Sequence, residues 1–353
     1  MKTLNQEPEI IAMANALRLV GDPVESILEF CRNKIAKWIK EYGSIRTIGD
    51  LERIVCEKLN LVIHEVWNDD DLDKLVKNYV EEGDFVFDHL KKDFDEKTFA
   101  TLIRRKSLSQ KSADRYVAII DCRGNKGPRK FFSRWHEIAH LLTLYKQMEL
   151  PLHRSTIEKD PTEKLMDIIA GEIGFYDPMF EPVLTTELKA NGQLTFAVVE
   201  NVRAQFCPDA SSHATLNACA ARVEIPVVVL EIGMILKKTE MRRVQSKQIE
   251  LIPSKPPTPR LRVITSMPNA AARNISMQIP KYMRVPNISV LAKTFKAETD
   301  SDLMSAEANE NLAWWTASDG SSLPNTQVRV QAIKVGDHVL AIVSLASSRW
   351  NRN

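Results

Sequence analysis

The sequence FFSRWHEIAHLL spans residues 131–142 and places two histidines and a glutamate within an otherwise largely apolar segment. Apolar side chains at most positions predict a helix that is buried on nearly all sides. His136 and His140 are four residues apart and therefore lie on one face of that helix, and Glu137 directly follows the first histidine. Because buried polar side chains need partners, the segment predicts either a metal site or a pair of hydrogen-bonded core histidines.

The spacing of these residues is that of the pattern His-Glu-x-x-His. In this pattern two imidazole nitrogens bind one metal ion, and one coordination position stays open. Glu137 can then act as a general base on a water molecule at that position. Nitrogen-rich ligation favours zinc, although the residues alone do not separate zinc from manganese. We therefore expect a hydrolase with Zn2+ as its cofactor, His136 and His140 as metal ligands and Glu137 as the catalytic residue.

A catalytic zinc ion normally has three protein ligands, so one more ligand must come from another part of the chain. Positions 143 and 146 are Thr143 and Lys146, which excludes the extended motif with a third histidine. The candidate carboxylates of the following segment are Glu158, Glu163 and Glu172.

A second helix is predicted from Asp160, because Asp160-Pro161 combines an N-cap residue with a proline at the first helical position. Glu163 lies in the first turn of this helix, and an antiparallel helix pair would bring its carboxylate to the metal. Residues 160–163 also fit a capping box, in which Glu163 would instead bind its own helix terminus. Spacing alone leaves both interpretations open.

Two segments resemble the ImmA/IrrE family of metallopeptidases. Residues 129–142 resemble the active-site helix of the family, and residues 163–173, EKLMDIIAGEI, resemble its second conserved pattern, Glu-x-x-Ala-Asn-x-Phe-Ala-Ala-x-Leu. The leading glutamate of that pattern is the third zinc ligand of the family, so the resemblance implies this role for Glu163. The resemblance covers about residues 47–180 and, more faintly, residues 215–238.

The chain departs from the family pattern at several positions. Met166 replaces the usual alanine, Asp167 replaces asparagine, and residues 174–176, Gly-Phe-Tyr, replace the usual Leu-Met-Pro. These departures concern the shape of the substrate cleft and leave the zinc-binding residues intact. Asp167 lies one turn after Glu163, so it is either an acceptor for a histidine ring N–H or a solvated aspartate.

The resemblance implies a zinc-dependent endopeptidase that cleaves a regulatory protein, typically a helix-turn-helix transcriptional repressor, in stress response or mobile-element control. By fold analogy, the strand predicted at 116–121 is expected to form the sheet edge to which an extended substrate adds. One alternative is a non-catalytic regulator with a zincin-like fold that acts by protein or DNA contact. Another is a zinc hydrolase of small molecules.

The predicted fold class is α+β, with a mainly helical zincin-like peptidase domain that contains a small sheet, and a smaller β-rich C-terminal domain. The linker is predicted from the sequence SKPPTP at 254–259. The expected segments are N-terminal helices at 1–45, the peptidase domain at 46–180, a helical segment at 181–250, a linker at 251–259 and a sensor-like or recruitment domain at 260–353.

Apolar periodicity predicts the elements within these segments. Helices are expected at 23–42, 48–59, 72–79, 94–105 and 131–145, and strands at 61–66, 116–121, 260–266, 288–292, 327–335 and 338–345. Residues 214–222 and 227–238, separated by Glu224-Ile225-Pro226, have the rhythm of a helix-turn-helix. Together with basic residues as far as Lys247, this motif predicts a weak DNA contact through 214–247.

Composition and charge are those of an ordinary globular protein. The formal net charge of +2 predicts no dominant electrostatic footprint for nucleic acid. Neither a signal peptide nor a membrane span is expected, because the N-terminus lacks an apolar core and no apolar run reaches about 18 residues. The five cysteines are scattered and form no Cys-x-x-Cys pair, which is typical of reduced thiols in a cytoplasmic protein.

Two further features lie outside these motifs. His153 lies between the two predicted ligand helices and is a candidate for approach to the metal site. The pair Trp314-Trp315 is expected to pack in a hydrophobic core, with a ligand pocket as the alternative.

Overall fold

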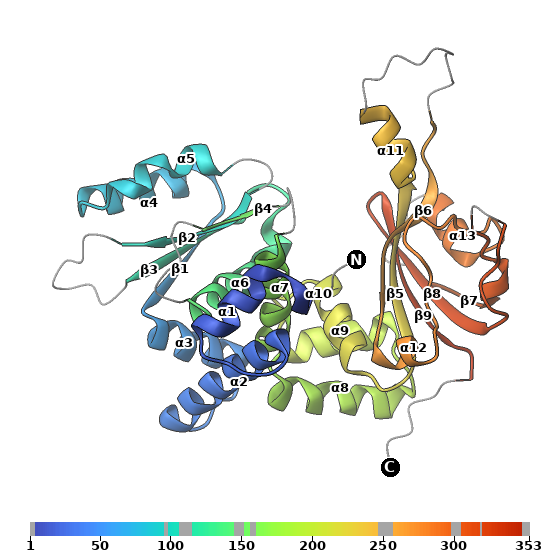
Figure 1. The fold of residues 1–353 in the computed structure, drawn as a ribbon, viewed down its shortest axis with the longest axis horizontal. Coiled ribbons are helices and arrows are strands. Elements are labelled where there is room, and N and C mark those ends of the chain that lie inside the picture. Colours follow the sequence, from blue (N-terminus) through green and yellow to red (C-terminus); the bar gives the residue numbers. More distant parts are fainter. Residues whose placement is uncertain are drawn as a thin grey trace. The chain divides into compact units, whose positions relative to one another are not determined.

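The computed structural model describes residues 4–94, 98–105, 115–144, 152–155, 160–245, 257–297, 305–317 and 320–347. For residues 91, 93, 152–155 and 243–245 it describes the backbone alone. The described residues form helices and two separate sheets, which confirms the predicted α+β class (Figure 1). Contacts divide the chain into two compact units. Unit 1 contains residues 1–183 and 203–214, and unit 2 contains residues 184–202 and 215–353.

The first helices of unit 1 begin where the sequence predicts. The Asp22 side chain accepts a hydrogen bond from the Glu25 amide at 3.0 Å, and Pro23 is the first helical residue of the next helix. The helices predicted at 23–42 and 48–59 are both confirmed, and the second is capped by Thr47. In chain order the elements are η1 (Leu4–Gln6), α1 (Pro8–Ala16), α2 (Pro23–Tyr42) and α3 (Ile48–Leu59).

The sheet of unit 1 has the strand order β1-β3-β2-β4, with β1 parallel to β3 and β2 antiparallel to both β3 and β4. The prediction that strand 116–121 is an open sheet edge is wrong, because this strand, β3, is paired on both sides. The helix predicted at 94–105 is also wrong, since most of that segment is β2, an inner strand. The strands are β1 (Leu61–Val66), β2 (Thr98–Arg104), β3 (Tyr116–Asp121) and β4 (Leu152–Ser155).

Helices cover both faces of this sheet. On one face, Leu72 and Phe87 pack in a cluster with Val117 and Ile119 of β3. Figure 1 shows α4 and α5 on this face and α6 on the other, where α6 contacts β2 and β3. Coverage on both faces explains why β3 is an almost continuous apolar run. The covering elements are α4 (Asp69–Glu81), η2 (Phe85–His89), α5 (Leu90–Asp93), η3 (Gly127–Arg129) and α6 (Lys130–Leu142).

The next helices lead from unit 1 to unit 2. α7 (Pro161–Gly174) belongs to unit 1 and packs against α6. The unit boundaries after residues 183, 202 and 214 fall within α8 (Asp177–Asn191), α9 (Phe196–Phe206) and α10 (Ser212–Arg222). Each of these three helices therefore contributes residues to both units.

Unit 2 is built on an antiparallel sheet with the strand order β6-β5-β9-β8-β7. The strands predicted at 260–266, 327–335 and 338–345 are confirmed, including the hairpin that turns at Gly336-Asp337. The strands are β5 (Val227–Ile235), β6 (Arg260–Pro268), β7 (Ala306–Asn311), β8 (Gln327–Val335) and β9 (His338–Leu345).

The predicted helix-turn-helix is wrong, because its second helix is strand β5. The sequence VVVLEIGMI at 227–235 is rich in β-branched residues, and β5 pairs with β6 on one side and β9 on the other. A central strand that is buried on both faces gives an apolar run that periodicity does not distinguish from a buried helix. The predicted DNA contact through 214–247 therefore loses the motif on which it rested.

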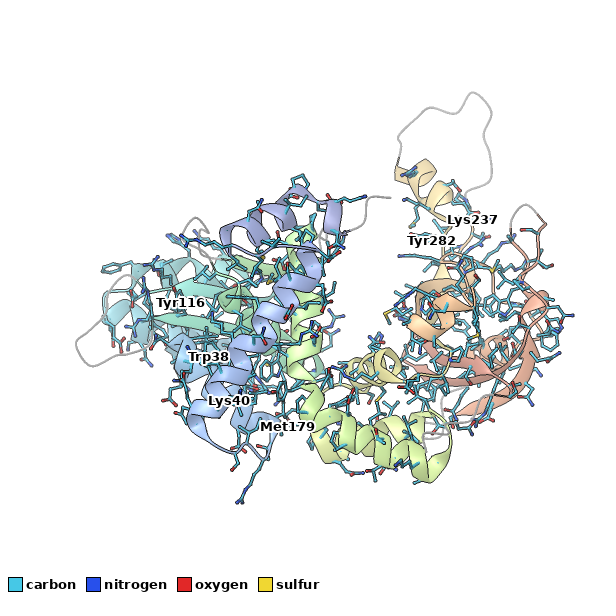
Figure 2. The ribbon with its side chains drawn as sticks, turned by 60° about the horizontal axis from the view of Figure 1, so that its bottom comes forward. Trp38, Lys40, Tyr116, Met179, Lys237 and Tyr282 are labelled. Carbon is cyan, nitrogen blue, oxygen red and sulfur yellow. The ribbon has the colours of Figure 1, made fainter. Side chains whose placement is uncertain are left out.

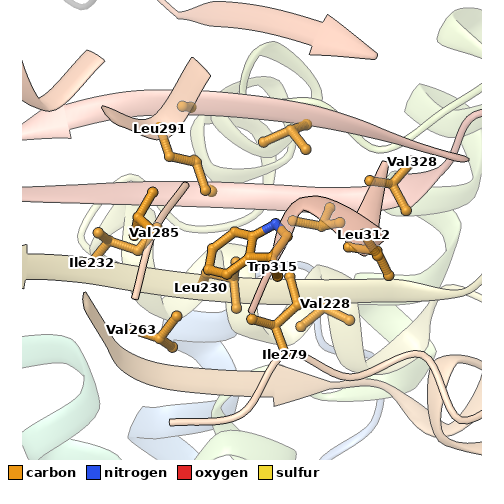
Figure 3. Packing of buried hydrophobic residues seen from close by; sticks show 14 of the residues in the cluster. Val228, Leu230, Ile232, Val263, Ile279, Val285, Leu291, Leu312, Trp315 and Val328 are labelled. Carbon is orange, nitrogen blue, oxygen red and sulfur yellow. The ribbon is translucent and has the colours of Figure 1, made fainter. Parts of the chain in front are cut away.

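The core of unit 2 contains the second tryptophan of the pair. Figure 3 shows Trp315 among Val228, Leu230 and Leu312, and this indole is 1% exposed. Core packing is thus confirmed for Trp315, whereas Trp314 is 41% exposed.

The remaining helices of unit 2 are short. The strand predicted at 288–292 is wrong, because the Ser289 side chain accepts a hydrogen bond from the Leu291 amide and caps a helix there. None of the described helices is both long and apolar enough to cross a membrane. These elements are α11 (Lys238–Gln245), α12 (Ala270–Asn274), α13 (Val290–Lys296) and η4 (Leu312–Trp314).

Candidate metal centre

Helix α6 carries the first part of the candidate site and is buried as predicted. Every residue from Ser133 to Leu142 is buried, including both histidines and Glu137. The apolar residues of α6 pack between the sheet and the helices α3 and α7. This environment holds the ligand side chains on a rigid element.

Three side chains converge at one point. The Nε2 atoms of His136 and His140 are 3.2 Å apart. Glu163 on α7 places one carboxylate oxygen 3.0 Å from Nε2 of His136 and the other 3.3 Å from Nε2 of His140. One ligand atom from each residue lies within 4.8 Å of the others. His136, His140 and Glu163 therefore form a cluster that could hold a metal ion.

The hydrogen bond from His136 to Asp167 leaves the other ring nitrogen of His136 available to bind a cation. The Asp167 carboxylate lies 3.0 Å from Nδ1 of His136, and an ionised carboxylate only accepts, so Nδ1 carries the ring proton. In a neutral ring, Nε2 then presents a lone pair to the Glu163 carboxylate. Two acceptors 3.0 Å apart repel each other unless a metal ion or a proton lies between them. The donor set thus fits a metal ion, and a protonated histidine is the alternative.

Glu163 binds the histidines and not the terminus of its own helix. Asp160 caps α7 by accepting a hydrogen bond from the Thr162 amide at 2.9 Å, while the Glu163 carboxylate faces the two rings. Burial by itself raises the pKa of Glu163, but contact with the two histidines outweighs burial and holds this pKa well below its usual range. The carboxylate is therefore ionised, as a metal ligand must be.

Among the competing third ligands, Glu172 is described and is not part of the cluster. Glu172 lies two turns further along α7 and forms an ion pair with Arg32, with 3.0 Å between Nε and the carboxylate. Glu158 lies outside the described residues. His153 belongs to β4, where only the backbone is described.

The two histidines differ in their outer contacts. Nδ1 of His136 is held by Asp167, whereas Nδ1 of His140 is buried without a hydrogen-bond partner among the described residues. Histidines that bind a metal usually donate this second N–H to a carboxylate, carbonyl or water. The ring orientation of His136 is therefore fixed by a hydrogen bond for which His140 has no counterpart among the described residues.

Glu137 is adjacent to the cluster in sequence and 1% exposed. A carboxylate beside a metal centre and shielded from bulk water is suited to accept a proton during hydrolysis. Its catalytic role stays a prediction.

Helices α6 and α7 approach each other closely where Gly174 meets Trp135. A Cβ atom at Gly174 would lie 2.8 Å from Cδ1 and 2.9 Å from Cγ of Trp135, closer than real side chains approach. Glycine at this position therefore lets the two helices approach each other. Gly174 thus has a packing role against Trp135, the residue that precedes His136.

Sequence reasoning missed the ion pairs that anchor the site helix. Arg134 of α6 is buried and contacts Glu65 of β1 at 2.5 Å and Glu52 of α3 at 3.0 Å. An arginine inside an apolar helix signals that carboxylates must lie nearby. Its partners are distant in sequence, so the pattern alone does not name them.

These observations define a candidate metal-binding centre of two histidines and a carboxylate on two packed helices. No model of a known protein family matches the chain, and no curated protein is significantly similar to it in sequence.

Proposed function

We propose that this protein is a zinc-dependent endopeptidase, with His136, His140 and Glu163 as metal ligands and Glu137 as the catalytic base. The observation that carries the proposal is the convergence of the two histidine Nε2 atoms and the Glu163 carboxylate. Two nitrogens and one carboxylate form a typical ligand set of a catalytic zinc, and they leave a coordination position open.

A bound zinc ion would polarise the scissile carbonyl and lower the pKa of a water molecule to about 7. Glu137 would take the proton of this water molecule and pass it to the leaving amine. Asp167 would hold His136 in the tautomer that leaves Nε2 available. Burial of α6 would keep bulk water from these groups.

The substrate class follows from the resemblance of residues 129–142 and 163–173 to the ImmA/IrrE metallopeptidases. It suggests a regulatory protein as the substrate, such as a helix-turn-helix repressor in the cytoplasm. The rival interpretation is a regulator that acts by contact alone. It has lost its main support, because residues 227–235 form a strand.

The proposal predicts about one zinc ion per chain in protein purified without chelators. We expect the variants His136→Ala and Glu163→Ala to lose most of this zinc, since each removes one of three ligands. Elemental mass spectrometry measures the metal, and Glu172→Ala is the matched control because its carboxylate pairs with Arg32. A wild-type protein without stoichiometric metal would contradict the proposal.

The variant Glu137→Gln separates the peptidase from the contact-only regulator in the same preparation. We expect it to keep its zinc and its fold but to lose cleavage of a peptide library by at least about a hundredfold, because the general base is removed. Mass spectrometry of the cleavage products measures this loss. Equal cleavage by the variant and the wild type would show that Glu137 is not the base.

A further inference from the structure

Unit 2 contains a cavity of about 800 Å³ whose lining is strongly basic. Its volume lies in the range of small-molecule sites. Among the described residues that line it, Glu240 is the one carboxylate, and it faces a larger number of cations. Figure 2 shows two lining residues, Lys237 and Tyr282, close to each other in unit 2. The cationic lining residues are Lys237, Lys238, Arg260, Arg262, Lys281 and Arg284.

Arg262 is the buried residue among these lining cations. It is 4% exposed, Nη1 donates to the Tyr282 carbonyl at 3.1 Å, and Nε is buried without a hydrogen-bond partner among the described residues. No ion pair joins Arg262 to a carboxylate within the described part of the chain. A buried guanidinium without an anionic partner is unfavourable, because burial removes its hydration without replacing it.

Two other buried arginines of the chain show what is missing at Arg262. The Arg105 guanidinium contacts Asp84 at 2.7 Å and Glu82 at 2.5 Å. The Arg134 guanidinium contacts Glu65 at 2.5 Å and Glu52 at 3.0 Å. Within the described residues, both of these arginines therefore form ion pairs with carboxylates, whereas Arg262 forms none.

The neighbours of Arg262 increase the positive charge around it. Arg262 and Arg284 lie opposite each other in an antiparallel bridge, which places like charges side by side. Burial lowers the pKa of Arg262, nearby Glu240 opposes this shift, and Arg260 and Arg284 lower the pKa further. Glu240 also accepts a hydrogen bond from the Lys237 amide at the start of α11, so part of its accepting capacity is used there.

We propose that this cavity binds the phosphate group of a small molecule that carries two or more negative charges. Guanidinium groups bind phosphate oxygens with paired hydrogen bonds, and ammonium groups add compact positive charge. A nucleic acid would instead require an extended open basic surface. This site lies in unit 2 and does not depend on the proposed peptidase activity.

Titration of the full-length protein with inorganic pyrophosphate at constant ionic strength tests the proposal. We expect saturable binding by calorimetry and a rise in the melting temperature, because the anion binds the folded state. Arg262→Met should weaken binding by about tenfold to a hundredfold, since it removes a buried charge-assisted contact. Arg284→Ala removes an exposed cation of the same cavity, and it repeats the test if Arg262→Met does not fold.

Arg273→Met is the matched control, because Arg273 is an exposed arginine of unit 2 that does not line the cavity. It should bind pyrophosphate like the wild type. Any removal of a metal from unit 1 by pyrophosphate affects all variants equally. A nucleoside triphosphate that binds more tightly than pyrophosphate would identify an organic phosphate, and equal binding would identify the inorganic group.

Three results would overturn the proposal. The first is no saturable binding of pyrophosphate up to roughly 10 mM. The second is equal weakening in Arg262→Met and Arg273→Met, which would indicate unspecific charge attraction. The third is tight binding of a DNA oligonucleotide together with absent pyrophosphate binding, which would assign the basic residues to nucleic acid.

Discussion

At the scale of single residues, the candidate site consists of His136 and His140 on α6 and Glu163 on α7. His136, Glu137 and His140 lie within one helical turn, so their pattern is readable from the sequence. Glu163 had two interpretations, and only the packing of α7 on α6 shows its carboxylate at the histidine rings. Arg134 has partners on β1 and α3, which no local pattern could identify.

Asp167 should tune the metal affinity without being a ligand. Its carboxylate accepts the Nδ1 proton of His136, so the variant Asp167→Asn weakens the group that orients this ring. We expect the zinc affinity to fall by about 10- to 100-fold with the fold retained. Competition with a fluorescent chelator measures the affinity.

The matched control is Asp160→Ala at the N-cap of the same helix. It should lower the free energy of unfolding by about 0.5–2 kcal/mol and leave the zinc affinity nearly unchanged. If Asp167→Asn binds zinc as tightly as the wild type, the aspartate has no role at the site.

At the scale of elements, the starts of capped helices can be predicted from the sequence. Short apolar runs do not show whether they form a helix or a strand. Asp22-Pro23 and Asp160-Pro161 both start helices in the structure, because the N-cap side chain and the proline act locally. The sequence predicts helices where the structure has β2 and β5, since both are inner strands and the apolar run of an inner strand resembles that of a buried helix. The helix α13 was predicted as a strand, although Ser289 provides its cap.

The contact between α6 and α7 predicts opposite effects for two glycines of α7. Gly174→Ala should lower the free energy of unfolding by about 1–3 kcal/mol, because its Cβ would meet the Trp135 ring at 2.8 Å. It should also weaken zinc binding, since the ligands lie on both helices. A Cβ atom at Gly171 would have its nearest neighbour, an atom of Phe132, at 3.9 Å. Gly171→Ala should therefore stabilise the protein by about 0.5–1 kcal/mol. Urea unfolding measures both variants, and equal effects would contradict the packing argument.

Asp121, the last residue of β3, is expected to make a pH-dependent contribution to stability. Burial raises the pKa of Asp121, but hydrogen bonds from Arg123 and Lys126 outweigh it and lower this pKa below its usual value. The contribution is therefore complete above the ordinary aspartate pKa of about 4 and is lost as the pH falls through the lower value in the folded state.

We expect Asp121→Asn to lower the free energy of unfolding by about 1.5–3 kcal/mol at neutral pH. The difference from the wild type should shrink as the pH falls below the ordinary aspartate pKa and through the lower pKa of the folded state, where the wild-type carboxylate also becomes neutral. Urea unfolding at several pH values measures it. The exposed Asp337 provides the control Asp337→Asn, and a difference that does not change with pH would contradict the assignment.

At the scale of the whole molecule, the units are not continuous stretches of sequence. Strand β5 follows the helices of the segment 181–250, yet it pairs with β6 and β9 of the segment 260–353. A proline-rich sequence at 254–259 predicts a linker, but local composition does not show which strands meet across it. The division of the chain into two units therefore depends on strand pairing, which local sequence patterns do not predict.

This pairing predicts how fragments of the chain behave. A fragment of residues 260–353 lacks β5, and with it Val228, Leu230 and Ile232 from the core of unit 2. Its strands β6 and β9 would lose their common neighbour, so the sheet could not close over its core. We expect this fragment to be unfolded by circular dichroism and to have poor dispersion of its amide proton signals. A fragment of residues 215–353 restores β5 and should show strand signal and dispersed amides. If the shorter fragment folds as well as the longer one, β5 is dispensable and the sheet order does not determine the boundary of the unit.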